Sequence, residues 1–336
     1  MLTLGIETSC DETSCAVLKG GREILSNVIA SSLFRHRPFG GVVPEIASRH
    51  CLEQIDTVFQ AALKKARVSK KDLGLIAVTY GPGLPGSLLV GLSFAKALAY
   101  ELDIPFIGVN HLEAHLSANF IDMPAPRGGY LGLVVSGGHT ELVYCRNSSV
   151  RLLGSTIDDA VGEAYDKVAK MLGLGYPGGP VIDRLARKGD PKAFRFSRPK
   201  QEGRFDFSFS GIKTAVRNVL ASPQFTRRRV NWKRNNLCAS FQETVVRWLV
   251  EKTIDACRFK KVKDVVVGGG VSANSRLRSL LPAEAEPFGI RVSFPPFRLT
   301  LDNGAMIARR GFELYRRGKY SPWMLSARPN LKIGEN

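Results

Sequence analysis

The stretch from Leu2 to Leu18 reads LTLGIETSCDETSCAVL, and the stretch from Tyr130 to Cys145 reads YLGLVVSGGHTELVYC. In each, two apolar runs flank a tight turn rich in glycine, hydroxyl or acidic residues, and this pattern predicts a β-hairpin. We expect strands at residues 2–6 and 15–18, and again at 130–135 and 141–145. Because helical segments lie between the hairpins, the repeat predicts two similarly folded α/β halves that face each other.

The turns between these strands carry groups that suit an anion or a cation. Residues 7–14 hold three acids among several hydroxyls, and residues 136–140 read SGGHT. Backbone N–H groups and hydroxyls in such turns can bind a phosphate, while carboxylates can hold a cation. Turns of this composition are also common without a ligand, so each one alone is a weak signal.

The segment Asn110-His111-Leu112-Glu113-Ala114-His115 is the strongest candidate for a functional site. Residues 105–109 predict a buried strand, so two histidines open a helix at a strand end, where sites in α/β folds usually form. Helical residues four apart share one face, and neutral imidazoles are common metal ligands. Asp302, at the expected start of the last long helix, is the candidate third ligand. The alternatives are two partly exposed histidines without a metal, and an aspartate that only caps its helix.

A run of three glycines in the second half is a further candidate for ligand contact. An apolar strand enters Gly268-Gly269-Gly270, and a helix is expected to follow with Ser272 as its cap. Glycines allow a flat or phosphorylated ligand to approach the backbone closely. The alternative is an ordinary tight turn between a strand and a helix.

Several acidic residues follow the second hairpin. Asp158 and Asp159 are expected in the first turn of a helix, where negative charge suits the helix dipole. Asp166 lies further along the same predicted helix and Asp183 on the next one, and each could reach a cleft or be a solvated surface charge.

The composition is that of a globular intracellular protein. Hydrophobic residues make up 44% of the chain, and no apolar run is long enough to cross a bilayer. The N-terminus lacks the basic and apolar regions of a signal peptide. The six cysteines form no Cys-x-x-Cys pair, which fits a reducing compartment. We therefore expect a cytoplasmic protein.

The charge points to a polyanionic partner. The formal net charge is +18, and between Arg184 and Arg234 fifteen Lys or Arg residues stand against three acids. Basic side chains bind phosphates, and the aromatic residues interleaved with them could stack on unpaired bases. The alternatives are a solvated surface or a protein-docking segment for the charges, and core positions for the aromatic side chains.

The motifs together resemble those of one known family, the tRNA N6-adenosine threonylcarbamoyltransferases of the bacterial TsaD (Gcp) type. They lie at residues 5–13, 110–115, 135–140, 158–160, 162–164, 176–180, 209–214, 268–274 and 302–306, so the resemblance spans nearly the whole chain in order. Two departures are visible. Leu301 stands where the family usually has Thr, and Cys51 stands where a His often follows Ser48-Arg49-His50.

The resemblance implies an α/β fold of two RNase-H-like, actin-like domains of the ASKHA superfamily with a cleft between them. The first domain would comprise residues 1–122, completed by a C-terminal helix at 302–336. The second would comprise residues 129–301, with a basic helical insertion at about 184–260.

The resemblance also implies an acyltransferase that makes t6A. Such an enzyme moves the threonylcarbamoyl group of threonylcarbamoyl-AMP to N6 of adenosine 37 in tRNAs reading codons that begin with A. One divalent metal, Fe2+ or otherwise Zn2+, would be held by His111, His115 and Asp302, and no residue need be a covalent nucleophile. Substrate would be contacted by the residues that match the family's ligand-binding positions: Val135, Ser136, Gly137, Gly138, His139, Asp166, Gly179, Asp183 and Asn274. The implied partners are tRNA, a TsaB-like paralogue and a TsaE-like P-loop ATPase, without a membrane.

Two other classes of function are alternatives to this one. A zinc metallo-endopeptidase needs His-Glu-x-x-His, with the Glu directly after the first His as the base, but Leu112 follows His111. A non-catalytic nucleotide-binding scaffold of the actin-like class would explain the hairpins and glycines. It would explain neither the metal-ligand set nor the basic stretch.

Overall fold

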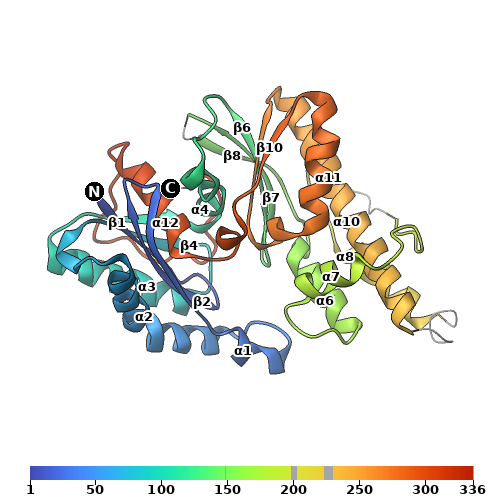
Figure 1. Cartoon of the computed structure of the whole chain (residues 1–336), viewed down its shortest axis with the longest axis horizontal. Helices are drawn as coiled ribbons and strands as arrows, with labels where there is room; N and C mark the ends of the chain where they lie inside the picture. Colours follow the sequence, from blue (N-terminus) through green and yellow to red (C-terminus); the bar gives the residue numbers. More distant parts are fainter. Residues whose placement is uncertain (148, 198–202, 223–229, 336) are drawn as a thin grey trace. The chain divides into compact units, whose positions relative to one another are not determined.

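The computed structural model describes residues 1–147, 149–197, 203–222 and 230–335 (Figure 1). The chain divides into two compact units. Unit 1 comprises Met1–Ala125 and Pro295–Asn336, and unit 2 comprises Pro126–Phe294. Each unit is built on its own five-stranded mixed sheet, which confirms the predicted pair of similarly built α/β halves.

The sheet of unit 1 has the strand order β3-β2-β1-β4-β5. Its strands are β1 (Leu2–Glu7), β2 (Glu12–Lys19), β3 (Glu23–Ser31), β4 (Leu73–Gly81) and β5 (Phe106–Asn110). The first three pair antiparallel, whereas β4 and β5 run parallel to β1. The carboxyl ends of β1, β4 and β5 therefore meet at one edge, where ligand sites of α/β sheets form.

Helices cover both faces of this sheet (Figure 1). They are α1 (Leu33–His36), α2 (Pro44–Ala66), α3 (Pro85–Leu102), α4 (His111–Ser117), α5 (Asn119–Asp122) and α12 (Gly304–Tyr315). Leu4 and Val17 pack towards α2 and α3, and the alternate residues Ala16 and Leu18 pack towards α12. A Cβ on Gly5 would lie 2.0 Å from the carbonyl oxygen of Gly304, so α12 lies directly on β1.

The helix expected at 302–336 ends at Tyr315, and residues 319–335 form a C-terminal strap along the edge of the unit 1 sheet instead. The Ser321 N–H donates to the Phe106 carbonyl oxygen at 3.2 Å, which covers part of the open edge of β5. Further along, the Asn110 side-chain amide donates to the Lys332 carbonyl oxygen at 3.0 Å. The strap thus reaches the residue that precedes α4.

The sheet of unit 2 has the strand order β10-β9-β6-β7-β8. Its strands are β6 (Tyr130–Val135), β7 (Thr140–Arg146), β8 (Ser149–Ser155), β9 (Asp264–Gly268) and β10 (Arg291–Ser293). Strands β6 to β8 form an antiparallel meander, and β9 runs parallel to β6. Because Val134 pairs with Gly268, the turns after β6 and β9 leave the sheet side by side.

The helices of unit 2 pack around one apolar core. They are α6 (Val161–Met171), α7 (Gly178–Ala186), α8 (Ser210–Ala221), α10 (Val230–Lys260) and α11 (Ser275–Ala285). Phe205, Phe207 and Phe209 are buried in this core, with Phe209 packed on Trp248. Among the described residues, no helix is long and apolar enough to cross a membrane.

Several local predictions were wrong. The sequence indicated neither β3 nor β8, the third strand of each meander. The first hairpin turn is shorter than expected, because β2 begins at Glu12 rather than Cys15. Helix α6 begins at Val161, so Asp158 and Asp159 lie before it. Asp158 instead accepts hydrogen bonds at the start of α8, including one from the Phe209 N–H at 2.7 Å.

Candidate functional site

Strand β5 leads directly into the helix that carries the two histidines. Asn110 caps α4, because its side-chain oxygen accepts hydrogen bonds from the N–H groups of Leu112 and Glu113 at 3.0 and 3.3 Å. His111 and His115 are 7% and 1% exposed. The alternative of two partly exposed surface histidines is therefore wrong.

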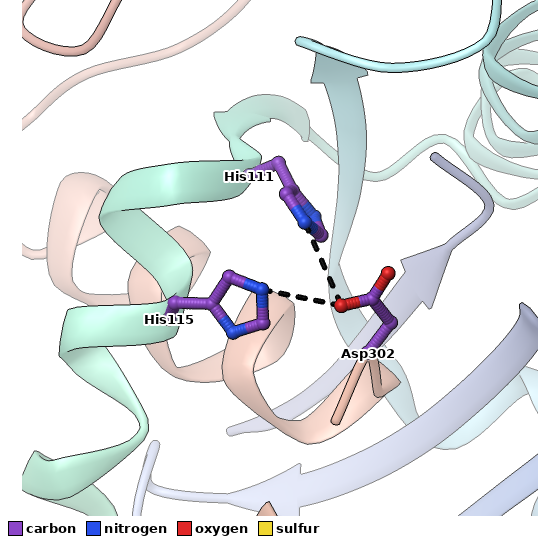
Figure 2. A group of neighbouring side chains, drawn as sticks. All are labelled: His111, His115 and Asp302. Carbon is purple, nitrogen blue, oxygen red and sulfur yellow. Dashed lines mark ion pairs between the residues drawn. The ribbon is translucent and has the colours of Figure 1, made fainter. Parts of the chain in front are cut away.

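The three predicted metal ligands lie together within unit 1 (Figure 2). One ligand atom from each of His111, His115 and Asp302 lies within 4.8 Å of the other two. Oδ1 of Asp302 is 3.1 Å from Nε2 of His115 and 3.6 Å from Nε2 of His111. Asp302 does not cap α12, since the side chain of Asn303 accepts from the Met306 N–H instead. Its alternative role as a cap is thus excluded.

Glu7 is fully buried at the end of β1 and its carboxylate meets His111. Its Oε2 lies 3.1 Å from Nδ1 of His111 and accepts a hydrogen bond from the Thr79 hydroxyl at 2.5 Å. Burial lowers the pKa of His111, but the carboxylates of Glu7 and Asp302 outweigh it and raise that pKa to about 9. The site thus favours positive charge at this imidazole.

The buried ring nitrogens of His115 suit coordination of a metal ion. Both of its ring nitrogens are buried and neither makes a well-aligned hydrogen bond among the described residues, although Nε2 lies 3.1 Å from Oδ1 of Asp302. Buried polar groups without partners are costly, and a coordinated metal would satisfy Nε2. Two imidazoles and one carboxylate are a donor set that divalent transition metals accept.

The turn after β1 adds negative charge near Asp302. Burial, together with the carboxylates of Asp302 and Asp11, raises the pKa of Glu12 well above its usual range. Burial and the same two carboxylates also raise the pKa of the Cys10 thiol. This concentration of acidic groups favours a cation at the histidine pair.

Glu113 has a structural role and does not act as a base. Its Oε2 accepts hydrogen bonds from Nε and Nη2 of Arg310 at 3.0 and 2.5 Å, and its Oε1 accepts one from the Gly334 N–H of the C-terminal strap. The pair is almost completely buried. A zinc endopeptidase needs a carboxylate free to take a proton from metal-bound water, and Glu113 does not meet that requirement.

The Ser136–His139 turn leaves β6 at its carboxyl end. The Ser136 N–H donates to the His139 carbonyl oxygen at 2.9 Å, and the His139 N–H donates to the Ser136 hydroxyl at 3.1 Å. The N–H groups of Gly137 and Gly138 have no partner among the described residues, and nothing lies within 4 Å of a Cβ built at either glycine. The side chain of Val135 is buried in the core, so this residue can contact a ligand only through its backbone.

Asp166 and Gly179 lie at the junction of α6 and α7. Oδ1 of Asp166 accepts a hydrogen bond from the Gly178 N–H at 2.7 Å, which anchors the first turn of α7. A Cβ on Gly178 would collide with Ala169, whereas one on Gly179 would meet nothing within 4 Å. Gly179 therefore borders open space.

Asn274 and Asp183 belong to one buried hydrogen-bond network. The Asn274 side chain caps α11 and donates to Oε1 of Gln242 at 2.8 Å, and Nε2 of Gln242 donates to Oδ1 of Asp183 at 3.1 Å. Oδ1 of Asp183 also accepts from the Ser275 hydroxyl at 2.7 Å. Ser272 is not the cap that we expected, because a 3-10 turn at Gly270–Ala273 separates β9 from α11.

A cavity of about 330 Å³ borders this network. Gln242 and Ser275 line it, together with the charged side chains of Arg187, Glu243 and Arg276. Arg276 is bonded to Glu243 at 2.6 Å, and Arg187 to Asp183 at 2.8 Å. The size suits a small polar ligand.

Gly269 holds the two turns of unit 2 together. Its φ is +92°, and a Cβ there would lie 2.3 Å from the Val135 carbonyl oxygen. The close approach of the β9 turn to the end of β6 therefore requires glycine. This packing explains part of the glycine run without a ligand.

The predicted basic segment is described only in part. Arg184, Arg187, Lys188, Lys192 and Arg195 are exposed. Arg227, Arg228 and Arg229, like Phe225, lie outside the described residues, and nothing is described of the Trp232 side chain. Phe194 and Phe196 pack partly against the core, and Phe205, Phe207 and Phe209 lie within it. The alternative of core positions is therefore confirmed for Phe205, Phe207 and Phe209, which are too buried to stack on bases.

Comparison with known proteins places this chain. A profile of the family described as TsaD, tRNA N6-adenosine threonylcarbamoyltransferase, matches residues 23–309. The chain belongs to the TsaD family. A curated relative of that name from Symbiobacterium thermophilum is 52% identical over 99% of this chain and 97% of its own length. One from Clostridium botulinum is 50% identical over 99% of this chain and 98% of its own.

Solved structures support the fold. HypF from T. kodakarensis aligns with a TM-score of 0.62 at 16% identity, over 94% of this chain and 48% of that one. Component A of the (R)-2-hydroxyglutaryl-CoA dehydratase from Acidaminococcus fermentans aligns with a TM-score of 0.56 at 16% identity, over 94% and 98%. The predicted fold class, family and transferase class are thus confirmed. The family name also identifies tRNA as the class of substrate.

Sequence reasoning missed several residues of these sites. Glu7 and Thr79 lie at the carboxyl ends of β1 and β4 beside β5, and parallel strand order could have predicted that they approach His111. Gln242, by contrast, is one polar residue within a long helix. No local signal marks it as the link between Asn274 and Asp183.

Proposed function

We propose that this chain transfers the threonylcarbamoyl group of threonylcarbamoyl-AMP to N6 of adenosine 37 in tRNA. The observation that carries the proposal is the convergence of His111, His115 and Asp302 in a chain that belongs to the TsaD family. The reaction needs a poor nucleophile, the exocyclic amine of adenine, to meet an activated carbonyl. Orientation and electrostatic stabilisation then contribute most of the rate.

His111, His115 and Asp302 would hold one divalent metal, which the family resemblance favours as Fe2+, with Zn2+ as the alternative. Three protein donors leave coordination positions for substrate or water. The metal when bound supplies Lewis acidity to the carbonyl and neutralises charge on the AMP leaving group. His111 and His115 would hold the metal in a buried site through Nε2, and this nitrogen must lose its proton before it can coordinate.

The adenylate would lie in unit 2. The unpaired N–H groups of Gly137 and Gly138 suit its phosphate. The open space at Gly179 and the cavity beside Gln242 and Ser275 suit its nucleoside. Asp166, Asp183 and Asn274 would help to hold α7 and α11 in place, because they form hydrogen bonds with residues of those helices and with Gln242. No residue is proposed as a covalent nucleophile.

Metal removal tests the first part of this proposal. His111→Ala and His115→Ala should each lower the metal content measured by elemental analysis and abolish transfer, while circular dichroism stays unchanged. Asp122→Ala, which removes an exposed carboxylate in the same unit, is the control and should keep both metal and transfer. Stoichiometric metal in the double histidine variant would refute the proposed ligand set.

Steric exclusion tests the adenylate site. Gly179→Val should weaken AMP binding, measured by calorimetry, without loss of stability, because a Cβ at this position would meet nothing within 4 Å. Gly128→Val adds the same side chain at an equally open glycine and should leave binding unchanged. Equal AMP affinity in the two variants would show that the nucleoside does not lie against Gly179.

The basic segment would bind the tRNA backbone. Lys188, Lys192 and Arg195 are exposed, and changing all three to Glu should weaken tRNA binding and flatten its salt dependence. The change of Lys64, Lys65 and Lys71 to Glu alters the net charge equally on unit 1 and serves as the control. Filter binding across a salt series measures both. Identical salt slopes in the two triple variants would assign the segment to another role.

The family resemblance supports a TsaB-like paralogue and a TsaE-like ATPase as partners, and the cytoplasm as the compartment where tRNA is modified. Phe34, Phe39 and Leu52 are each at least 60% exposed on and beside α1 and α2, which suits contact with a protein. Phe39→Ser and Leu52→Ser should reduce co-purification of a tagged paralogue. Full recovery of the complex would exclude this surface.

A further inference from the structure

The Nδ1 atom of His111 has two polar neighbours, both buried. Oε2 of Glu7 lies at 3.1 Å and the hydroxyl oxygen of Ser9 at 3.2 Å. The other ring nitrogen, Nε2, faces Asp302 at 3.6 Å. The two nitrogens of this imidazole therefore meet carboxylates on opposite sides, one in the candidate metal site and one behind it.

Glu7 is held rigidly by its own partners. Oε1 accepts a hydrogen bond from the Ser9 backbone N–H at 2.5 Å, and Oε2 accepts one from the Thr79 hydroxyl at 2.5 Å. These donors belong to the turn after β1 and to β4, and Glu7 and Thr79 are completely buried. The position of the carboxylate is thus fixed by the sheet, not by the helix that carries His111.

We propose that Glu7 is a positioning residue for the metal centre: its carboxylate holds the proton of His111 on Nδ1 and leaves Nε2 free to coordinate. A carboxylate can only accept a hydrogen bond, so the facing ring nitrogen must donate. Such outer partners fix the tautomer and orientation of a ligating imidazole. The inference rests on the metal centre proposed above.

The substitution Glu7→Gln should move the proton of His111 from Nδ1 to Nε2, with almost no change in the shape of residue 7. The Ser9 N–H can only donate, so the amide oxygen of the glutamine must take the position of Oε1. The amide NH2 group then takes the position of Oε2, next to Nδ1 of His111 and the Thr79 hydroxyl. Because this group can only donate, Nδ1 must accept, and the proton moves to Nε2, where it blocks the metal.

The decisive measurement is the Zn2+ affinity of the full chain, by competition with a chromophoric chelator. Glu7→Gln should bind Zn2+ about 10- to 100-fold more weakly than the wild type. Ser9→Ala removes the other neighbour of Nδ1 but keeps the carboxylate, so it should bind nearly as tightly as the wild type. Wild-type affinity in a folded Glu7→Gln variant would overturn the inference.

Two further measurements test the inference without relying on the Glu7→Gln variant alone. In the Zn2+-loaded wild type labelled with 15N-histidine, NMR should find the His111 proton on Nδ1. A proton on Nε2 would overturn the inference even if Glu7→Gln does not fold. His115→Ala and Asp302→Ala should weaken Zn2+ binding. If neither variant loses Zn2+ affinity, the proposed metal centre is wrong and this inference is wrong with it. If both lose Zn2+ affinity while Glu7→Gln does not, only the role of Glu7 is refuted.

Discussion

The ion pair between Glu113 and Arg310 should be a major source of stability in unit 1, and Glu113→Gln tests it. The side chains of Glu113 and Arg310 are 2% and 6% exposed, so neither charge has access to water. Removing one partner of a buried pair costs about 3–5 kcal/mol, because the other charge is left buried. Arg310 keeps a second contact to Glu313 at 3.1 Å, so we expect the lower end, about 3 kcal/mol.

The paired variant Glu113→Gln with Arg310→Met is the matched control. It leaves no buried charge unpaired, since Glu313 retains Arg317 at 2.8 Å. Replacing both partners of a buried pair is often close to neutral. The double variant should therefore recover most of the stability that the single variant loses.

The assay must report on unit 1, because unfolding of a chain with two units need not be two-state. The chain has three tryptophans, and Trp323 on the C-terminal strap packs against Phe106 in unit 1. Its 19F signal after 5-fluorotryptophan labelling can be followed through a urea titration. With a slope of about 2 kcal/mol per molar urea, the single variant should unfold about 1.5 M earlier. A shift too small to measure, or a double variant as unstable as the single one, would refute the reasoning.

Three further predictions follow from single residues. Burial raises the pKa of Glu141 to about 7 from 4.5, so the folded state binds its proton more tightly and stability should fall as pH rises through this interval. This loss of stability, up to about 3 kcal/mol, should be absent from Glu141→Gln when urea midpoints are measured between pH 4 and 8. A pH profile of Glu141→Gln parallel to that of the wild type would contradict the prediction. Gly269→Ala should destabilise unit 2 in thermal melts, because of its positive φ and the contact with Val135, whereas Gly179→Ala should not. The pKa of about 9 at His111 makes protons compete with the metal, so Zn2+ affinity should rise about tenfold per pH unit between pH 6.5 and 8.5, and a flat profile would exclude that competition.

The parts of the fold with strong local patterns could be predicted from the sequence. Apolar runs around SGGHT defined β6 and β7 almost to the residue. The spacing of His111 and His115 placed both on one face of α4. Strands β3 and β8 were missed because both are edge strands with polar, half-exposed residues, so neither has a clear apolar alternation.

The contacts that complete the site depend on residues far apart in the chain. His111 and Glu7 are 104 positions apart, and Glu113 and Arg310 are 197 apart, so no local pattern encodes either pair. The charged surroundings of Phe205, Phe207 and Phe209 suggested a surface role. The alternation of Phe205, Phe207 and Phe209 with polar residues is instead that of a segment whose aromatic side chains point into the core.

The division of unit 1 along the chain affects how the protein is made. Residues 1–125 leave the ribosome first, yet the sheet face that includes Ala16 and Leu18 is covered only when α12, at residues 304–315, has been synthesised. Unit 2 is continuous in sequence and can fold earlier. A nascent chain stalled before residue 304 should therefore hold a native unit 2 beside an unfinished unit 1 with an apolar face exposed to chaperones. We therefore expect unit 1, which begins the chain, to complete its folding after unit 2.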